Sequence, residues 1–145
     1  MLLTELFSGP STWKWTEDSQ RYAQAVFAVD DLRFEVSIQL APQHRTAAQV
    51  PSVDPTRVWI VEFGLINGPG NHYAFDITGT GKAVVVFATV VALLKEFAKA
   101  RGVAAYQFSA GEPSRRRLYD RLASRLGTSV VTFVSDYEKR YFVTI

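Results

Sequence analysis

Hydrophobic and polar residues alternate along Leu32–Leu40. Every second position is apolar, and the positions between them are occupied by Arg, Glu, Ser and Gln. An alternation with a period of two predicts a β-strand with one buried side and one solvent-facing side. Arg21–Val29 precedes this segment across Asp30 and Asp31, and the two segments together predict a β-hairpin.

A nearly continuous apolar run follows at Arg57–Ile66. Such a run predicts an interior strand that is covered on both faces. Asn67–Gly70 is rich in turn-forming residues, so we expect His72–Thr78 to return as a further strand. Ala41–Pro55 lies between this region and the first hairpin. It contains three prolines and no periodicity, which predicts a long loop over residues 41–55.

Two helices are predicted in the second half of the chain. Lys82–Arg101 is apolar around most of its circumference, and Gly102 follows at a position typical of a helix end. Leu118, Leu122 and Leu126 recur at helical spacing and predict the buried stripe of a helix over Pro113–Leu126. Further strands are expected at Val103–Ser109, Thr128–Ser135 and Arg140–Ile145.

These elements predict one domain over residues 1–145, because a chain of this length buries a substantial core. Residues 1–20 form an N-terminal arm in which Trp13 and Trp15 either make a short strand or cover a sheet edge. The expected order is β-β-β-β-α-β-α-β-β. The fold class is therefore α/β in the α+β sense, with a mixed, largely antiparallel sheet flanked by two main helices.

Composition excludes several classes of function. The chain has no cysteine, which rules out disulfides, thiolate metal sites and a cysteine nucleophile. The longest apolar run, Ala83–Leu94, is too short to span a membrane, and the first ten residues lack the basic lead-in of a signal peptide. We therefore expect a soluble protein that is not secreted and has no membrane partner.

Charge is distributed unevenly along the chain. Residues 1–81 carry 5 basic and 9 acidic side chains, whereas residues 82–145 carry 11 basic and 5 acidic ones. The net charge of +2 thus conceals a basic C-terminal half that would attract an anionic ligand or an acidic partner.

The glycine-rich turn Thr78–Gly81 stands directly before the first predicted helix. A phosphate-binding P-loop would need glycine in place of Asp76 and serine or threonine in place of Ala83, and the dinucleotide fingerprint would need a third glycine. Free N–H groups at a helix start favour an anion. The alternative is that the glycines only allow a sharp turn from strand to helix.

Five of the 11 arginines lie on the second predicted helix: Arg115, Arg116, Arg117, Arg121 and Arg125. Those in its first turn are disfavoured by the helix dipole, so Glu112 or Asp120 would have to compensate for their charge. Arg117, Arg121 and Arg125 are spaced four residues apart and form one basic stripe. The stripe suggests a surface for phosphate or an acidic protein; the alternative is a solvated helix face. Nucleic acid is not expected, since no known binding module is present.

Two residues are candidates for acid–base chemistry. Glu62 lies among apolar residues of the Arg57–Ile66 strand, where burial would raise its pKa and suit a general base; alternatively it faces solvent. Tyr119 follows the leucine stripe by one position and faces a cleft or packs in the core. His44 and His72 have no ligand spacing around them, so no metal site is predicted.

The order of elements and these motifs resemble the GNAT family of N-acetyltransferases. In that family the backbone of a turn with Gln or Arg at its start and two small residues at its end holds the pyrophosphate of acyl-CoA. Asp76–Gly81 aligns with that turn. The resemblance implies that the pyrophosphate would lie against Thr78, Gly79, Thr80, Gly81, Lys82 and Ala83, assisted by Arg117. It also implies that Tyr119 would serve as the general acid, with acetyl-CoA as the cofactor. If the chain transfers an acyl group, Glu62 would serve as the base.

Several positions depart from the family pattern. Asp76 replaces Gln or Arg in the turn, Glu112 and Arg115 replace an Asn and an Ala before the Leu-Tyr pair, and Ala123 replaces a Gly. The paired helices that build the acceptor site in the family have no counterpart before the 41–55 loop.

Several short motifs occur together along the chain: Trp59–Phe63, Thr78–Gly81, Val86–Val90, Phe108–Ala110, Glu112–Arg115 and Leu118–Ala123. In this combination the chain also resembles small uncharacterised proteins of tailed bacteriophages. That resemblance implies a location in the host cytoplasm or the virion. Two functions follow as hypotheses. The chain is a non-catalytic component that binds a virion or host protein through Arg115, Arg116, Arg121 and Arg125, or it is an acyl-CoA-dependent N-acyltransferase acting on an amine.

Overall fold

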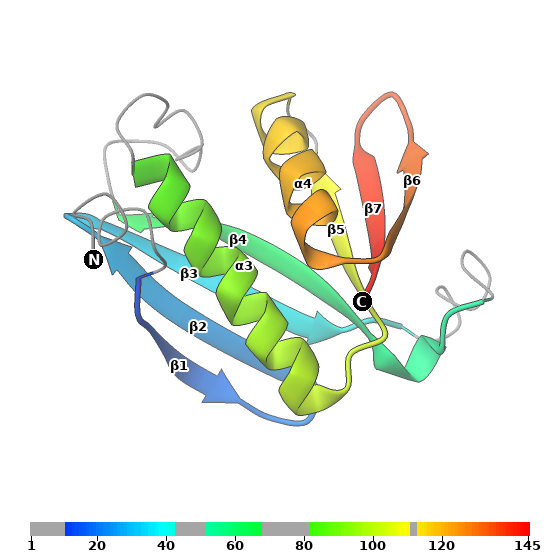
Figure 1. Ribbon diagram of the computed structural model, residues 1–145, viewed down its shortest axis with the longest axis horizontal. Helices are drawn as coiled ribbons and strands as arrows, with labels where there is room; N and C mark the ends of the chain where they lie inside the picture. The colour runs from blue at the N-terminus through cyan, green and yellow to red at the C-terminus, as the bar shows by residue number, and fades with distance from the viewer. Residues whose placement is uncertain (1–10, 43–51, 68–81, 111–112) are drawn as a thin grey trace.

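A computed structural model describes residues 11–42, 52–67, 82–110 and 113–145 (Figure 1). These residues form a seven-stranded sheet with two long helices packed on one face. The strands, in chain order, are β1 (Trp13–Asp18), β2 (Tyr22–Val29), β3 (Leu32–Leu40), β4 (Val58–Asn67), β5 (Ala105–Ala110), β6 (Ser129–Val134) and β7 (Lys139–Thr144). The helices are α3 (Lys82–Arg101) and α4 (Pro113–Leu126), and a short 3-10 turn, η1 (Pro55–Arg57), precedes β4.

The strand order in the sheet is β1-β2-β3-β4-β5-β7-β6. All neighbouring strands are antiparallel except β4 and β5, which are parallel and are connected through α3. The predicted mixed, largely antiparallel sheet with two main helices is confirmed. The predicted strand at residues 72–78 lies outside the described residues. The four described strands before α3 begin with β1, which contains Trp13 and Trp15.

The β2–β3 hairpin forms where the alternation predicted it. Asp30 adopts a left-handed backbone conformation, with φ of 55°, which Asp tolerates better than most residues. Val29 therefore pairs directly with Leu32. Alternate side chains, from Ala23 to Val29 and from Phe34 to Ile38, are buried toward the helices, whereas Gln24, Glu35 and Ser37 line the other face.

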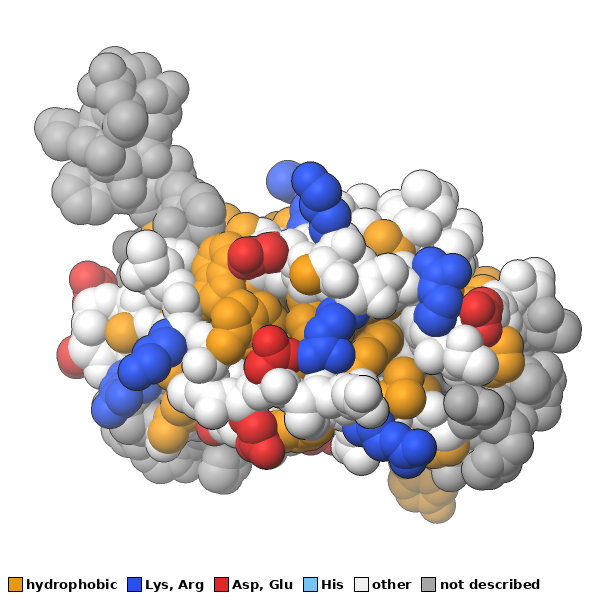
Figure 2. Space-filling model, turned by 90° about the horizontal axis from the view of Figure 1, so that it is seen from below, with side chains coloured by type: hydrophobic (Ala, Val, Ile, Leu, Met, Phe, Trp, Pro, Cys, Tyr) orange, Lys and Arg blue, Asp and Glu red, His pale blue; other side chains and the backbone are white. Residues whose placement is uncertain are grey.

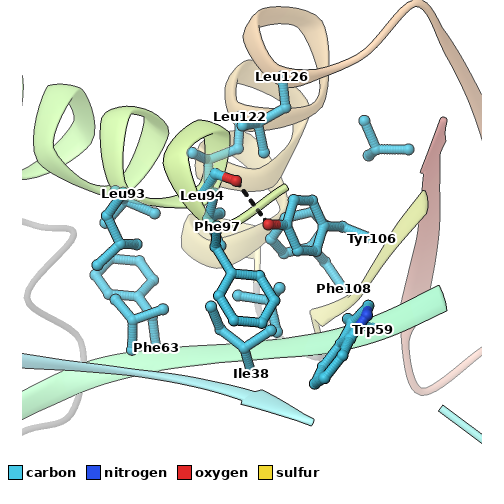
Figure 3. Packing of buried hydrophobic residues seen from close by; sticks show 14 of the residues in the cluster. Ile38, Trp59, Phe63, Leu93, Leu94, Phe97, Tyr106, Phe108, Leu122 and Leu126 are labelled. Atoms are coloured by element: carbon cyan, nitrogen blue, oxygen red, sulfur yellow. Dashed lines mark hydrogen bonds between the residues drawn. The ribbon is translucent and has the colours of Figure 1, made fainter. Parts of the chain in front are cut away.

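The main core lies between the sheet and the two helices. Figure 1 shows α3 crossing β2, β3 and β4, with α4 beside it over β5 and β7. Aromatic rings dominate the contact: the rings of Trp59 and Phe97 meet edge to face with 5.1 Å between their centroids. Figure 3 shows Phe97 directed from α3 toward the sheet, which carries Ile38 and Trp59, with leucines of both helices on the other side. Leu122 and Leu126 of the predicted stripe are buried, and Leu118 is half-buried.

The end of α3 is fastened to the sheet by an arginine. The guanidinium of Arg101 lies over the rings of Trp59 and Phe97, forms an ion pair with Asp18 and donates a hydrogen bond to the carbonyl of Ser19. Figure 2 views this end of the molecule, where hydrophobic side chains gather with cationic and anionic side chains among them. The helix ends at Gly102, whose φ of 64° reverses the chain toward β5.

The prediction that the first apolar strand is covered on both faces is wrong. Val61 and Phe63 face α3, but Glu62 and Ile66 are exposed. Only the start of β4 is covered on its second face, where Val58 packs in a small separate cluster. That cluster consists of Ala41, Val53, Val58, Ala105 and Phe142, with Ile60, Ala104 and Phe133 partly buried against it. Apolar residues at the start of the strand thus serve two clusters, which makes the run continuous without burying the whole strand.

Candidate functional site

The one parallel contact in the sheet is short. β4 and β5 pair only at Val58 with Ala105, Trp59 with Tyr106 and Ile60 with Gln107. β4 then continues to Asn67 and β5 to Ala110 without further pairing between them. Figure 1 shows the two strands diverging, with α3 lying over β4 and α4 over β5 and β7. We call this three-pair contact and the divergence beyond it the β4–β5 seam.

Helix α3 begins next to the predicted anion-binding turn. Thr78, Gly79, Thr80 and Gly81 lie outside the described residues, so the structure does not test that part of the prediction. Lys82 and Ala83 are the first two residues of α3. Their backbone N–H groups belong to the first turn, which has no acceptors within the helix, and that turn contains no acidic residue. The backbone at this position is suited to an anion.

Glu62 is exposed on the sheet face that carries no helix. It pairs across the sheet with Ser37, and its neighbours Val61 and Phe63 point the opposite way, into the core. Of the two alternatives for Glu62, the solvent-facing one is therefore observed, and burial does not support a role as a base.

Tyr119 is buried on the helix side of the sheet, with 1% of its surface exposed. Its ring packs 5.3 Å from that of Phe108 and meets the ring of Tyr141 edge-on at 6.1 Å. Of its two alternatives, packing in the core is observed. Glu62 and Tyr119 thus lie on opposite faces of the sheet, and the structure does not bring the two predicted acid–base residues together.

A cluster of polar groups joins α4 to β7. The hydroxyl of Tyr141 lies 2.7 Å from Oδ1 of Asp120 and 3.1 Å from the carbonyl of Arg116, and Nζ of Lys139 lies 3.0 Å from the same Asp120 oxygen. Desolvation opposes ionisation of Asp120, but the hydrogen bonds from Tyr141 and Lys139 and the charge of Lys139 outweigh it and hold its pKa below the usual value. Desolvation and then the Asp120 carboxylate raise the pKa of Tyr141 above its usual range.

The sequence did not identify this cluster. Asp120 was considered as a compensating charge for the arginines of its own helix, but its cationic partner is Lys139 on β7. No spacing rule joins a helix residue to a lysine on a later strand, because their proximity depends on how α4 packs.

The arginines of α4 differ in their surroundings. Arg117 and Arg121 are exposed and form no ion pair with any residue in the described ranges. Arg125 is also exposed, and its guanidinium lies 5.9 Å from the ring centroid of Phe87 on α3. Arg116 is half-buried and points Nε toward the carbonyl of Ala110. The side chain of Arg115 lies outside the described residues. The exposed stripe of Arg117, Arg121 and Arg125 is what the spacing predicted.

Within the described ranges, no group of three or more His, Cys, Asp or Glu side chains is placed to hold a metal ion. Nor does any helix there combine the length and apolar character that crossing a membrane requires. No protein-family model, curated protein or solved structure matches the chain.

Proposed function

We propose that this chain is a GNAT-like domain that binds an acidic protein partner, a virion component or a host factor, and does not catalyse acyl transfer. The separation of Glu62 and Tyr119 by the sheet carries the proposal. A general base and a general acid must both reach the reacting atoms, within hydrogen-bonding distance or through one water. A solvent-facing carboxylate on one face and a buried phenol on the other do not meet that condition.

Architecture supports the GNAT-like part of the proposal. The sheet order, the single parallel pair and the helices that precede and follow β5 agree with the element order on which the resemblance rests. One departure from the GNAT pattern concerns the helices that build the site for the acyl acceptor in that family. β1 and β2 are joined directly through Ser19–Arg21, so no helices lie between them.

The arginine stripe supports the binding part. Arg117 and Arg121 present charge that no described carboxylate neutralises, because Asp120 is already engaged by Lys139 and Tyr141. Unpaired guanidinium groups on one helix face suit carboxylates of a partner protein.

Two measurements test the proposal. The first follows release of the free thiol from acetyl-CoA in the presence of a pool of amines, including lysine peptides and polyamines. We expect no release above the background rate. A rate that disappears in Tyr119→Phe would overturn the non-catalytic assignment.

The second measurement addresses the arginine surface. Binding of poly-glutamate, as a probe of acidic protein surfaces, is measured for the wild type and for Arg117→Glu/Arg121→Glu. Lys95→Glu/Lys99→Glu is the matched control, since it makes the same charge change at exposed positions of α3. We expect the arginine variant alone to lose binding; equal losses in both variants would show that only net charge matters.

A second candidate function, acyl-CoA-dependent N-acyltransfer, is favoured by the β4–β5 seam. β4 and β5 pair at three positions only, and an acyl-CoA ligand would have to lie where the two strands no longer pair, with its phosphates at the start of α3. Calorimetric titration with acetyl-CoA tests it, with Gly81→Trp as the blocking variant and Gly81→Ala as its control. Binding that is lost only in the tryptophan variant would support acyl-CoA binding. An absence of binding at millimolar ligand would remove this candidate.

A further inference from the structure

The two edges of the sheet differ in how they are protected. Edge strands expose unpaired backbone groups, and proteins usually guard them with charges, prolines or bulges. β1 has such features, because it carries Lys14, Glu17 and Asp18 and its pairing with β2 shifts register between Trp15 and Glu17. β6 at the other edge has none of them. From Gly127 to Ser135 the sequence contains no charged residue and no proline.

β6 is also apolar on both of its faces. Val130 is 41% exposed, Val131 43% and Val134 68%, although they are large hydrophobic side chains. Val130 and Val134 lie on one side of the sheet and Val131 on the other. The helices and the small second cluster leave all three valines exposed. Exposed apolar surface on a strand with an open edge marks a place where another strand adds to the sheet.

The free backbone groups of β6 follow from its pairing with β7. The N–H of Ser135 donates to the carbonyl of Glu138 at 2.9 Å. Because hydrogen-bonded positions alternate in an antiparallel ladder, Phe133 and Val131 also bond to β7, opposite Arg140 and Phe142. The N–H and C=O groups of Val130, Thr132 and Val134 therefore point away from β7, toward the open edge.

We propose that β6 pairs antiparallel with β6 of a second copy of this chain, about a twofold axis at Thr132, so that two sheets join into one. Thr132 then faces Thr132 of the second copy, with the outward backbone groups of both bonded to each other. Val130 faces Val134 of the second copy, and Val131 faces its Phe133. Between Val130 and Val134 every cross-strand pair is apolar or threonine with threonine, and such pairs stabilise antiparallel sheets.

This register favours a second copy over an unrelated strand, because it pairs the apolar positions of β6 with apolar positions of an identical β6. A twofold dimer uses the same patch on both subunits, so each favourable pair occurs twice.

Charge substitutions test the register directly. Mass is measured by light scattering after gel filtration over a range of concentrations, and we expect the wild type to reach twice the mass of one chain. Val130→Lys/Val134→Lys places lysine opposite lysine twice and should give a monomer. Val130→Glu/Val134→Lys places glutamate opposite lysine twice and should restore the dimer. Val84→Lys, at an exposed valine of α3, is the control and should remain dimeric.

Three results would overturn the proposal: a wild type that stays monomeric at millimolar concentration, a lysine–lysine variant that stays dimeric, or a glutamate–lysine variant that stays monomeric. The substituted valines are exposed, so the variants keep the folded core.

A backbone substitution provides an independent test. Thr132→Pro removes an N–H group that points away from β7, so the β6–β7 ladder is retained. We expect this variant to be monomeric, with an unchanged circular dichroism spectrum, and Thr132→Ala to remain dimeric. A dimeric Thr132→Pro would contradict pairing through this edge.

Discussion

The hydroxyl of Tyr106 donates a hydrogen bond to the backbone carbonyl of Leu94, with 2.6 Å between the two oxygens (Figure 3). Both residues are fully buried. The bond joins β5 to the middle of α3 at the point where β5 meets β4, so it stabilises the β4–β5 seam as well as the core. Burial alone raises the pKa of Tyr106 far above its usual range.

Replacing Tyr106 with Phe should weaken the fold modestly. The carbonyl of Leu94 keeps its place in the helical hydrogen-bond ladder, so the loss is that of one buried hydrogen bond, about 1 kcal/mol in the free energy of unfolding. Urea titration followed by tryptophan fluorescence measures it. Tyr137→Phe is the control, because Tyr137 is 85% exposed and should change stability little.

Stability should fall in alkaline solution. The unfolded chain ionises its tyrosines near pH 10, whereas folded Tyr106 keeps its proton because its pKa is raised. The contribution of Tyr106 to the free energy of unfolding is therefore complete below about pH 10 and is lost above it. The free energy then falls by at most about 1.4 kcal/mol per pH unit for each such tyrosine. Tyr106→Phe should flatten this decline. An unchanged slope in the variant would show that other groups control alkaline unfolding.

Asp120 should contribute to stability at neutral pH but not in acid. Its pKa is lowered in the folded protein, so its contribution is present above the unfolded value near pH 4 and is lost as the pH falls through the folded pKa. Half of its side chain is exposed, so screening keeps the effect below about 1 kcal/mol. Asp120→Asn should be less stable than the wild type at pH 7 and equal to it in acid, as measured by urea titration at each pH. A difference independent of pH would point to packing instead.

Gly127 should be essential for packing the end of α4 on β7. A Cβ atom at this position would lie 2.4 Å from both the carbonyl oxygen of Thr144 and Cγ1 of Val143. One of these contacts is backbone, so the helix end or the strand must shift. Gly127→Ala should therefore cost about 1–3 kcal/mol of stability. Gly64→Ala is the matched control, since a Cβ at Gly64 meets nothing within 4 Å; similar losses in both would exclude a steric cause.

Strand periodicity predicted the fold well because the elements are locally encoded. The alternation of Leu32–Leu40, the cap of Lys82–Arg101 at Gly102 and the leucine stripe of α4 gave elements whose bounds the structure reproduces to within a residue or two. The error over Arg57–Ile66 arose because an apolar run was interpreted as burial of the strand on both faces. In the structure the apolar residues of β4 divide between a main core and a small second cluster.

The site could be predicted only in part. The arginine stripe followed from spacing on one helix. The Asp120–Lys139–Tyr141 cluster and the opposite placement of Glu62 and Tyr119 depend on which sheet face the helices cover, and one sequence does not contain that information. A tyrosine one position beyond a leucine stripe can turn toward a cleft or the core, and here the rings of Phe108 and Tyr141 hold it in the core.

The short β4–β5 seam has a consequence for the order in which the chain folds. From β1 to β4 every neighbour in the sheet is also a neighbour in the sequence, whereas the seam joins Val58 to Ala105 across the whole of α3. Closing long loops costs more entropy than closing short ones, and non-local pairing slows folding. The first four strands can thus assemble as a meander, and we expect β5 to pair with β4 later. The three pairs that join the halves of the sheet are then expected to form after the local hairpins.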